Sequence, residues 1–124
     1  MITGVGIDII EVDRVMDKIG KENGFREKIF SKAEIAYCDS KPNKGENYAA
    51  RFAAKEAFLK ATGFGLTLGY TLADVEVIQN SDGKPLLNLK GDFKTKAIEH
   101  NWTKIHLSIS HLQAIACAVV IIEQ

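Results

Sequence analysis

Asp8 and Glu56 are two acidic residues whose surroundings do not suggest an ordinary solvated role. Asp8 follows Gly4 and Gly6 at alternate positions of an apolar segment, so on a strand it shares a face that carries no other bulky side chain. Glu56 lies among apolar residues in a helical segment, on one stripe with Lys60. If the fold brings the two carboxylates together they repel each other, and a cation that prefers oxygen ligands, such as Mg²⁺, stabilises the pair.

The segment RFAAKEAFLKATGFG, residues 51–65, carries further positive charge. An advance of about 100° per residue puts Arg51, Lys55 and Thr62 on a second stripe, away from Glu56 and Lys60. Both stripes do not fit on a single solvent-exposed face of the helix. We therefore expect one of them to face a functional site. Arg51, Lys55 and Lys60 are then candidates to bind phosphate groups. Alternatively, Glu56 and Lys60 form an ordinary i,i+4 ion pair, worth about 0.2–0.5 kcal/mol.

Two weaker patterns leave a structural interpretation open beside a functional one. Gly63 and Gly65 let a backbone approach a ligand closely, but GFGLTLG is neither a P-loop nor a dinucleotide fingerprint, and a helix C-cap is the simpler explanation. Ser110 and His111 end an alternating segment and point to opposite faces of an extended chain. A hydrolytic dyad is therefore disfavoured, and ligand contact, capping and packing stay open for both residues.

The elements that must position these residues follow from hydrophobic periodicity and turn signals. Residues 2–10 alternate as a strand with Val5, Ile7 and Ile9 on one face, and Ser31 with Glu34 has the spacing of a capping box. The other predicted elements are helices from Val12 to Gly20 or Gly24, over 31–39, 46–62 and 92–100, a hairpin of 72–79 with 86–90, and strands over 104–111 and 114–122. Ile105, Leu107 and Ile109 are expected to face inward, and 114–122 is apolar enough to be covered on both faces. This order predicts an α+β fold with a mainly antiparallel sheet packed against helices.

Composition limits the functional classes. A chain of 124 residues with 46% hydrophobic residues suits a single domain spanning 1–124. Sixteen basic and sixteen acidic residues balance, which argues against a generic nucleic-acid binder. No apolar run is long enough to cross a membrane, and MITGVGIDII lacks the pattern of a signal peptide, so we expect a cytoplasmic protein. Cys38 and Cys117 have no metal-binding spacing and are expected to be free thiols.

Four motifs, GVGIDIIEVDR, RFAAKEAFLKA, DGKP and LSISH, occur in an order that closely resembles the bacterial holo-acyl-carrier-protein synthases, the small 4′-phosphopantetheinyl transferases. The resemblance spans nearly the whole chain and implies the 4′-phosphopantetheinyl transferase fold. It also implies transfer of the 4′-phosphopantetheine arm of coenzyme A to a serine of apo acyl carrier protein, in support of fatty acid biosynthesis. The products are holo acyl carrier protein and adenosine 3′,5′-bisphosphate.

The resemblance also implies residue roles. Asp8 and Glu56 correspond to the Mg²⁺ ligands and are catalytic together with Lys60, which also contacts the coenzyme phosphates. The remaining candidate coenzyme contacts are Arg51, Lys55, Gly63, Gly65, Lys84, Pro85, Ser110 and His111. The nucleophile belongs to the carrier protein, and its proton goes either to Glu56 or to a water on the metal.

The family resemblance further implies a homotrimer with active sites between neighbouring subunits. Acyl carrier proteins are strongly acidic, so a basic docking surface is expected despite the neutral chain, and residues 14–32 contain more basic than acidic residues. The docking candidates are Arg14, Lys18, Lys21 and Arg26, led by Arg14 and Arg26. A solvated helix face explains the same pattern.

One departure from the family pattern is Leu112, which follows SISH where the family usually has a small polar or acidic residue. It bears on local coenzyme contacts more than on the reaction. Two alternatives stay open: a non-catalytic module that binds coenzyme A or carrier protein, and a different Mg²⁺-dependent enzyme such as a nucleotide pyrophosphohydrolase. Loss of Asp8, Glu56 or Lys60 would indicate the first, and all three are present.

Overall fold

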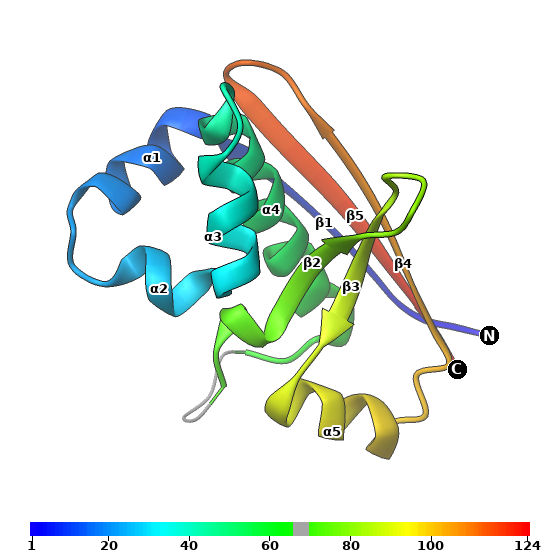
Figure 1. The fold of residues 1–124 in the computed structure, drawn as a ribbon. Coiled ribbons are helices and arrows are strands. Elements are labelled where there is room, and N and C mark those ends of the chain that lie inside the picture. Colours follow the sequence, from blue (N-terminus) through cyan, green and yellow to red (C-terminus); the bar gives the residue numbers. More distant parts are fainter. Residues whose placement is uncertain (66–69) are drawn as a thin grey trace.

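The computed structural model describes residues 1–65 and 70–124 and has the predicted α+β architecture (Figure 1). The elements are β1 (Ile2–Glu11), α1 (Val12–Gly20), α2 (Phe25–Ile29), α3 (Lys32–Asp39), α4 (Lys44–Thr62), the 3₁₀ turn η1 (Leu72–Asp74), β2 (Val75–Gln79), β3 (Pro85–Leu89), α5 (Gly91–Glu99), β4 (Lys104–His111) and β5 (Ile115–Glu123). The predicted strands and helices are confirmed with small changes at their ends. Two details differ: α2 was not predicted, and residues 72–74 form η1, so that the first strand of the hairpin begins only at Val75. No helix within the described ranges is long and apolar enough to span a membrane.

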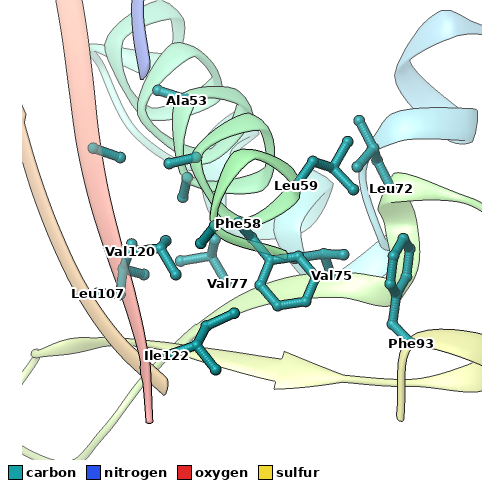
Figure 2. Packing of buried hydrophobic residues seen from close by; sticks show 14 residues of the cluster. Ala53, Phe58, Leu59, Leu72, Val75, Val77, Phe93, Leu107, Val120 and Ile122 are labelled. Atoms are coloured by element: carbon teal, nitrogen blue, oxygen red, sulfur yellow. The ribbon is translucent and has the colours of Figure 1, made fainter. Parts of the chain in front are cut away.

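Two antiparallel sheets form the β part of the fold. The larger has the strand order β1-β5-β4, and the smaller is the β2-β3 hairpin. In Figure 1 the helices α1 to α4 lie on one side of the larger sheet, with α4 nearest to its strands. Figure 2 shows the apolar side chains that fill this layer, among them Phe58 of α4, Val75 and Val77 of β2, and Val120 and Ile122 of β5. Leu107 is buried with them, and Ile105 and Ile109 pack against the same cluster, as predicted.

Gly4 and Gly6 allow α4 to lie directly against β1. A Cβ atom on Gly6 would lie 1.9 Å from the carbonyl oxygen of Ala57, and one on Gly4 would lie 1.9 Å from that of Ala61. Any side chain at these positions would force the helix away from the strand, since real Cβ atoms do not approach backbone so closely. Asp8 is the next residue on the same face of β1. The two glycines therefore bring the backbone of α4 close to the Asp8 carboxylate.

The opposite face of β1 is apolar and exposed. Val5, Ile7 and Ile9 share one face, as predicted, and are 59%, 65% and 68% exposed. Their cross-strand neighbours on β5 are Ile121, Val119 and Cys117. Along β5 buried residues alternate with less buried ones, so a single protomer covers one face of this strand rather than both. An apolar surface that follows two neighbouring strands is typical of a protein interface.

The ends of α3 and α4 are fixed by local signals that the sequence shows. Ser31 caps α3 and forms the predicted capping box with Glu34. Gly63 ends α4 in the left-handed conformation, with φ of 74°, and its N–H donates to the carbonyl of Leu59. In contrast, α2 has five residues and no side-chain cap, which explains why sequence patterns did not reveal it.

Candidate active site

Lys60 connects α4 to β1 at the position of Asp8. Its Nζ atom donates to Asp8 Oδ1 and to the Ile7 carbonyl oxygen, each at 3.0 Å. A lysine ammonium has three N–H groups, so one donor remains for a ligand. The Lys60 side chain is 56% exposed, whereas that of Asp8 is 14% exposed. The lysine therefore reaches from the surface over a carboxylate that is largely withdrawn from water.

The Asp8 carboxylate is only half satisfied. Its Oδ2 atom is buried and has no hydrogen-bond partner among the described residues. Burial raises the pKa of the neighbouring Glu56 carboxyl above its ordinary value, and the negative charge of Asp8 raises it further, while Lys60 and Lys18 act in the opposite direction. Two such carboxylates, one with an unused buried oxygen, form a suitable binding place for a cation with oxygen ligands.

A hollow of about 430 Å³ opens beside Glu56 and Lys60. It is lined by Glu56, Leu59, Lys60, Gly63, Phe64 and Gly65. The structure thus brings together five predicted site residues: Asp8 and Lys60 by direct contact, and Glu56, Gly63 and Gly65 around the same hollow. Gly63 also has the C-cap role that the simpler interpretation predicted. The two interpretations of the glycines are therefore compatible.

A second hollow, of about 230 Å³, contains other predicted residues. Arg51, Pro85 and His111 line it, together with Tyr37 and further residues of α4, β2 and β4. Arg51 is only 5% exposed, and its Nε atom is buried without a hydrogen-bond partner among the described residues. A buried guanidinium N–H without an acceptor is costly, and the positive charge of the guanidinium suits this hollow to an anion. The two hollows have no described lining residue in common.

Lys55 does not face either hollow, which corrects the prediction that it contacts the coenzyme. Its side chain is fully buried, and Nζ donates to Glu34 Oε1 at 2.8 Å and to the carbonyl oxygens of Leu72 at 2.8 Å and Val75 at 2.7 Å. Burial lowers the pKa of the Lys55 ammonium, and the Glu34 carboxylate opposes this change. All three N–H donors are used inside the fold, so Lys55 is a residue of the core.

The sequence profile of the 4′-phosphopantetheinyl transferase superfamily matches residues 4–120, a range that contains both hollows. The chain belongs to this superfamily.

Relatives within the 4′-phosphopantetheinyl transferases match over almost their full length. A holo-[acyl-carrier-protein] synthase of Cytophaga hutchinsonii is 45% identical over 120 residues, which cover 94% of this chain and 94% of that protein. A crystal structure of such a synthase from Bacillus anthracis in complex with CoA (3′,5′-ADP) is 35% identical, with a TM-score of 0.79 and coverage of 98% and 96%. The Neisseria meningitidis synthase is 27% identical, with a TM-score of 0.91 and full coverage of both chains.

Two other predicted positions of this transferase, Lys84 and Ser110, lie outside the two hollows, as does Leu112, the departure from the family pattern. Lys84 belongs to the β2-β3 turn, where its backbone N–H donates to Asn80 Oδ1, and its side chain is exposed. Ser110 pairs with Cys117 across the open face of the sheet, and so it points away from His111, as predicted. Leu112 follows β4 and is 74% exposed. Within one protomer these residues are not gathered with Arg51.

The predicted docking residues lie on or near α1. Arg14 and Lys21 are exposed, and the ammonium of Lys18 lies over aromatic rings of α2 and α4 at 5.7 and 5.8 Å. The Arg26 guanidinium is 2.9 Å from Glu27 Oε1 and also approaches a carboxylate of α3 at 3.5 Å. Arg14 and Lys21 therefore offer their charge more freely than Arg26 does.

Sequence reasoning missed several residues of the second hollow. Tyr37, Asn47 and Gln79 line it, and Glu46 Oε1 lies 2.8 Å from Nδ1 of His111. Asn47 is four residues before Arg51 and hence on the same stripe of α4, so helical spacing provided a usable signal for it. Tyr37 and Gln79 come from α3 and β2, and only the tertiary fold brings them to Arg51.

Proposed function

We propose that this chain transfers the 4′-phosphopantetheine group from coenzyme A to a serine of apo acyl carrier protein, in support of fatty acid biosynthesis. The observation that carries the proposal is the buried Asp8 Oδ2, which has no partner within residues 1–65 and 70–124, beside Glu56 and Lys60 in a chain of the 4′-phosphopantetheinyl transferase superfamily. The full-length match to a holo-[acyl-carrier-protein] synthase supports the acceptor, and the relative in complex with CoA (3′,5′-ADP) supports the donor. The free thiols of Cys38 and Cys117 are consistent with a cytoplasmic location.

The donor set fits a Mg²⁺ ion held by Asp8 and Glu56. Asp8 Oδ2 has no hydrogen-bond partner among the described residues, and burial together with the Asp8 charge raises the pKa of Glu56, so the pair has room for a further positive charge besides Lys60. Among the described residues there is no cluster of three His, Cys, Asp or Glu side chains. Two carboxylates completed by phosphate oxygens and water are a common arrangement for Mg²⁺. When bound there, the ion supplies positive charge that neutralises the pyrophosphate oxygens.

The remaining chemistry requires positioning more than covalent participation by this chain. The serine oxygen of the carrier protein forms a bond to the phosphorus that bears the pantetheine arm, and its proton passes to Glu56 or to a water molecule. The bond from this phosphorus to the bridging pyrophosphate oxygen breaks, and adenosine 3′,5′-bisphosphate leaves with the electron pair. The third N–H of Lys60 is placed to donate to a phosphate oxygen as negative charge develops. Gly63 and Gly65 leave room for the substrate beside Glu56.

The adenosine end of the coenzyme is assigned to the second hollow. Arg51 supplies a buried positive charge for the 3′-phosphate, and His111 lies at the same hollow with its ring oriented by Glu46. Pro85 provides an apolar contact. The two hollows have no described residue in common. One coenzyme molecule therefore binds to Asp8 and Glu56 of one protomer and to the Arg51 hollow of a neighbouring protomer.

This arrangement requires an oligomer, and we propose a homotrimer. The exposed apolar face of β1, formed by Val5, Ile7 and Ile9, continues onto β5 and is a suitable subunit interface. Burial of this face explains why an otherwise soluble chain presents apolar side chains on an edge strand. Lys84 and Ser110, which do not reach the Arg51 hollow in one protomer, stay candidates for contacts across this interface.

The test is intact-mass spectrometry of an apo acyl carrier protein incubated with this protein, coenzyme A and Mg²⁺. We expect the carrier to gain about 340 Da, the mass of the phosphopantetheine arm. Excess chelator is expected to abolish the gain, and added Mg²⁺ is expected to restore it. Coenzyme A that binds without any gain on several carrier proteins would instead indicate the non-catalytic binding module. Release of adenosine 3′,5′-bisphosphate without carrier protein would indicate a pyrophosphohydrolase.

Charge reversal on α1 tests the docking surface. We expect the double variant Arg14→Glu, Lys21→Glu to raise KM for acyl carrier protein about tenfold and to leave KM for coenzyme A unchanged, because an acidic partner loses two attractive charges. The effect is expected to shrink as salt concentration rises. Lys94→Glu, a reversal on the exposed surface of α5, is the matched control. If the double variant and the control have the same KM for carrier protein, docking takes place elsewhere.

A further inference from the structure

Arg51 is held in place by an aromatic ring. The Cζ atom of its guanidinium lies 4.2 Å from the ring centroid of Tyr37, which comes from α3. The Nε atom of Arg51 is buried and has no hydrogen-bond partner among the described residues, and the residue is only 5% exposed. Among the described residues, the face of the Tyr37 ring is in position to stabilise the charge of this guanidinium.

Tyr37 is in turn held by the hairpin. The side-chain Nε2 of Gln79 on β2 donates to the Tyr37 hydroxyl at 2.9 Å. Gln79 is paired with Pro85 across the hairpin, and both residues line the hollow together with Tyr37 and Arg51. A chain of contacts thus runs from the β2-β3 hairpin through Gln79 and Tyr37 to the guanidinium.

We infer that Tyr37, oriented by Gln79, positions Arg51 and thereby makes the second hollow selective for a coenzyme that carries a 3′-phosphomonoester over its 3′-dephospho form. This inference rests on the proposed function, since it takes the ligand of the hollow to be the adenosine end of coenzyme A. Tyr37 is a positioning residue, because it acts through Arg51 and not on the reacting atoms.

Positioning matters because a guanidinium recognises phosphate through a planar fork of N–H donors. The fork binds well only when its plane is fixed before the ligand arrives, and a stacked ring fixes that plane. The ring also stabilises the buried charge, which keeps it available when the hollow is empty. Without the ring, the guanidinium has to be ordered by the ligand itself, and the 3′-phosphate loses its binding advantage.

The test compares ligands and donors that differ only in the 3′-phosphate. Binding is measured by calorimetry with adenosine 3′,5′-bisphosphate and with adenosine 5′-monophosphate, and transfer is measured with coenzyme A and with 3′-dephospho-coenzyme A. We expect Tyr37→Leu to reduce the preference for the 3′-phosphorylated member of each pair about tenfold. KM for coenzyme A is expected to rise, while kcat and the KM for 3′-dephospho-coenzyme A stay near their original values.

Two further variants separate the ring from its hydroxyl. Tyr37→Phe removes the hydrogen bond at 2.9 Å and keeps the ring, and Gln79→Leu removes the same bond and replaces one polar lining residue of the hollow; we expect each to reduce the preference by about threefold or less. The double variant is expected to show no more loss than either single one, because both remove the same contact. Tyr70→Leu is the control for a lost ring, because Tyr70 packs against Phe93 and does not line this hollow.

The outcomes distinguish this inference from the proposed function. If Tyr37→Leu weakens both members of each pair equally, or neither, the positioning role is refuted even when the wild-type protein transfers phosphopantetheine normally. If the wild-type protein transfers nothing but prefers adenosine 3′,5′-bisphosphate in a Tyr37-dependent way, the positioning role stands and the transferase proposal fails.

Discussion

Replacing Glu56 with Gln is expected to reduce phosphopantetheine transfer by about 10³-fold while making the metal-free protein more stable. The loss follows from the proposed function, because an amide would not supply the negative charge that would hold a cation beside Asp8, and charge neutralisation is the main catalytic contribution in phosphoryl transfer. The gain in stability follows because burial and the Asp8 charge both raise the pKa of Glu56, so its ionised form is disfavoured in the fold.

The sign of the pH dependence follows from the same shift. A carboxyl whose pKa is higher in the folded than in the unfolded state binds more protons when folded, so metal-free wild-type protein gains stability as pH falls through the raised pKa. Glu56→Gln lacks this group and should lose that gain. Thermal unfolding in chelator across the acidic and neutral range measures the difference.

Controls separate the site from general effects on charge. Glu99→Gln removes a carboxylate from the exposed end of α5, and both its activity and its pH dependence should match the wild type. Asp8→Asn should lose activity as Glu56→Gln does, because it removes the other carboxylate of the pair. A Glu56→Gln protein that transfers phosphopantetheine at the normal rate would show that Glu56 does not act together with Asp8 in catalysis.

Much of this site could be predicted from local patterns. Alternation placed Gly4, Gly6 and Asp8 on one face of a strand, and helical spacing placed Glu56 and Lys60 on one stripe. The strand lies against the helix because both glycines lack a side chain at the closest contacts, 1.9 Å for an added Cβ. Periodicity assigned the residues to faces, but it did not show that the Val5 face of β1 is open, since that depends on what packs against the strand.

The failure at Lys55 has a different physical origin. Lys55 and Lys60 are both lysines on the same helix, and a lysine stem is compatible with either an apolar or a wet environment. What decides the burial of Lys55 is Glu34, 21 residues earlier in the chain, and two carbonyl groups of the segment that leads into β2. The capping role of Glu34 was visible in the sequence, whereas its ion pair with Lys55 depends on tertiary packing.

The prediction for Arg51 shows the same limit, because its tertiary contacts were not visible in the sequence. Its position on α4 indicated a phosphate ligand, and its buried Nε, without a partner in the part of the chain that the structure describes, agrees with that role. Tyr37 and Gln79, which orient it, come from separate elements and carry no recognisable spacing. Sequence motifs therefore indicated the candidate ligand-binding groups better than the groups that position them.

Lys55→Met and Lys60→Met, the same substitution five residues apart, are expected to have opposite consequences. Lys55→Met should reduce the free energy of unfolding by about 3–5 kcal/mol, because it leaves the Glu34 carboxylate, 1% exposed, without its cationic partner. Two carbonyl oxygens, of Leu72 and Val75, also lose their donor. Lys60→Met should change stability by less than about 1 kcal/mol, since Lys60 is largely exposed, and should remove most of the activity.

Urea unfolding at neutral pH measures both variants, and Glu34→Gln in the Lys55→Met background identifies the cause. The neutral amide still accepts a hydrogen bond from the backbone N–H of Ser31 or Val77, so the double variant should be more stable than Lys55→Met alone. Equal stability of the two would mean that the lost carbonyl contacts, and not the unpaired charge, account for the destabilisation. If Lys55→Met unfolds at the wild-type urea concentration but loses affinity for coenzyme A, Lys55 contacts the coenzyme and does not stabilise the core.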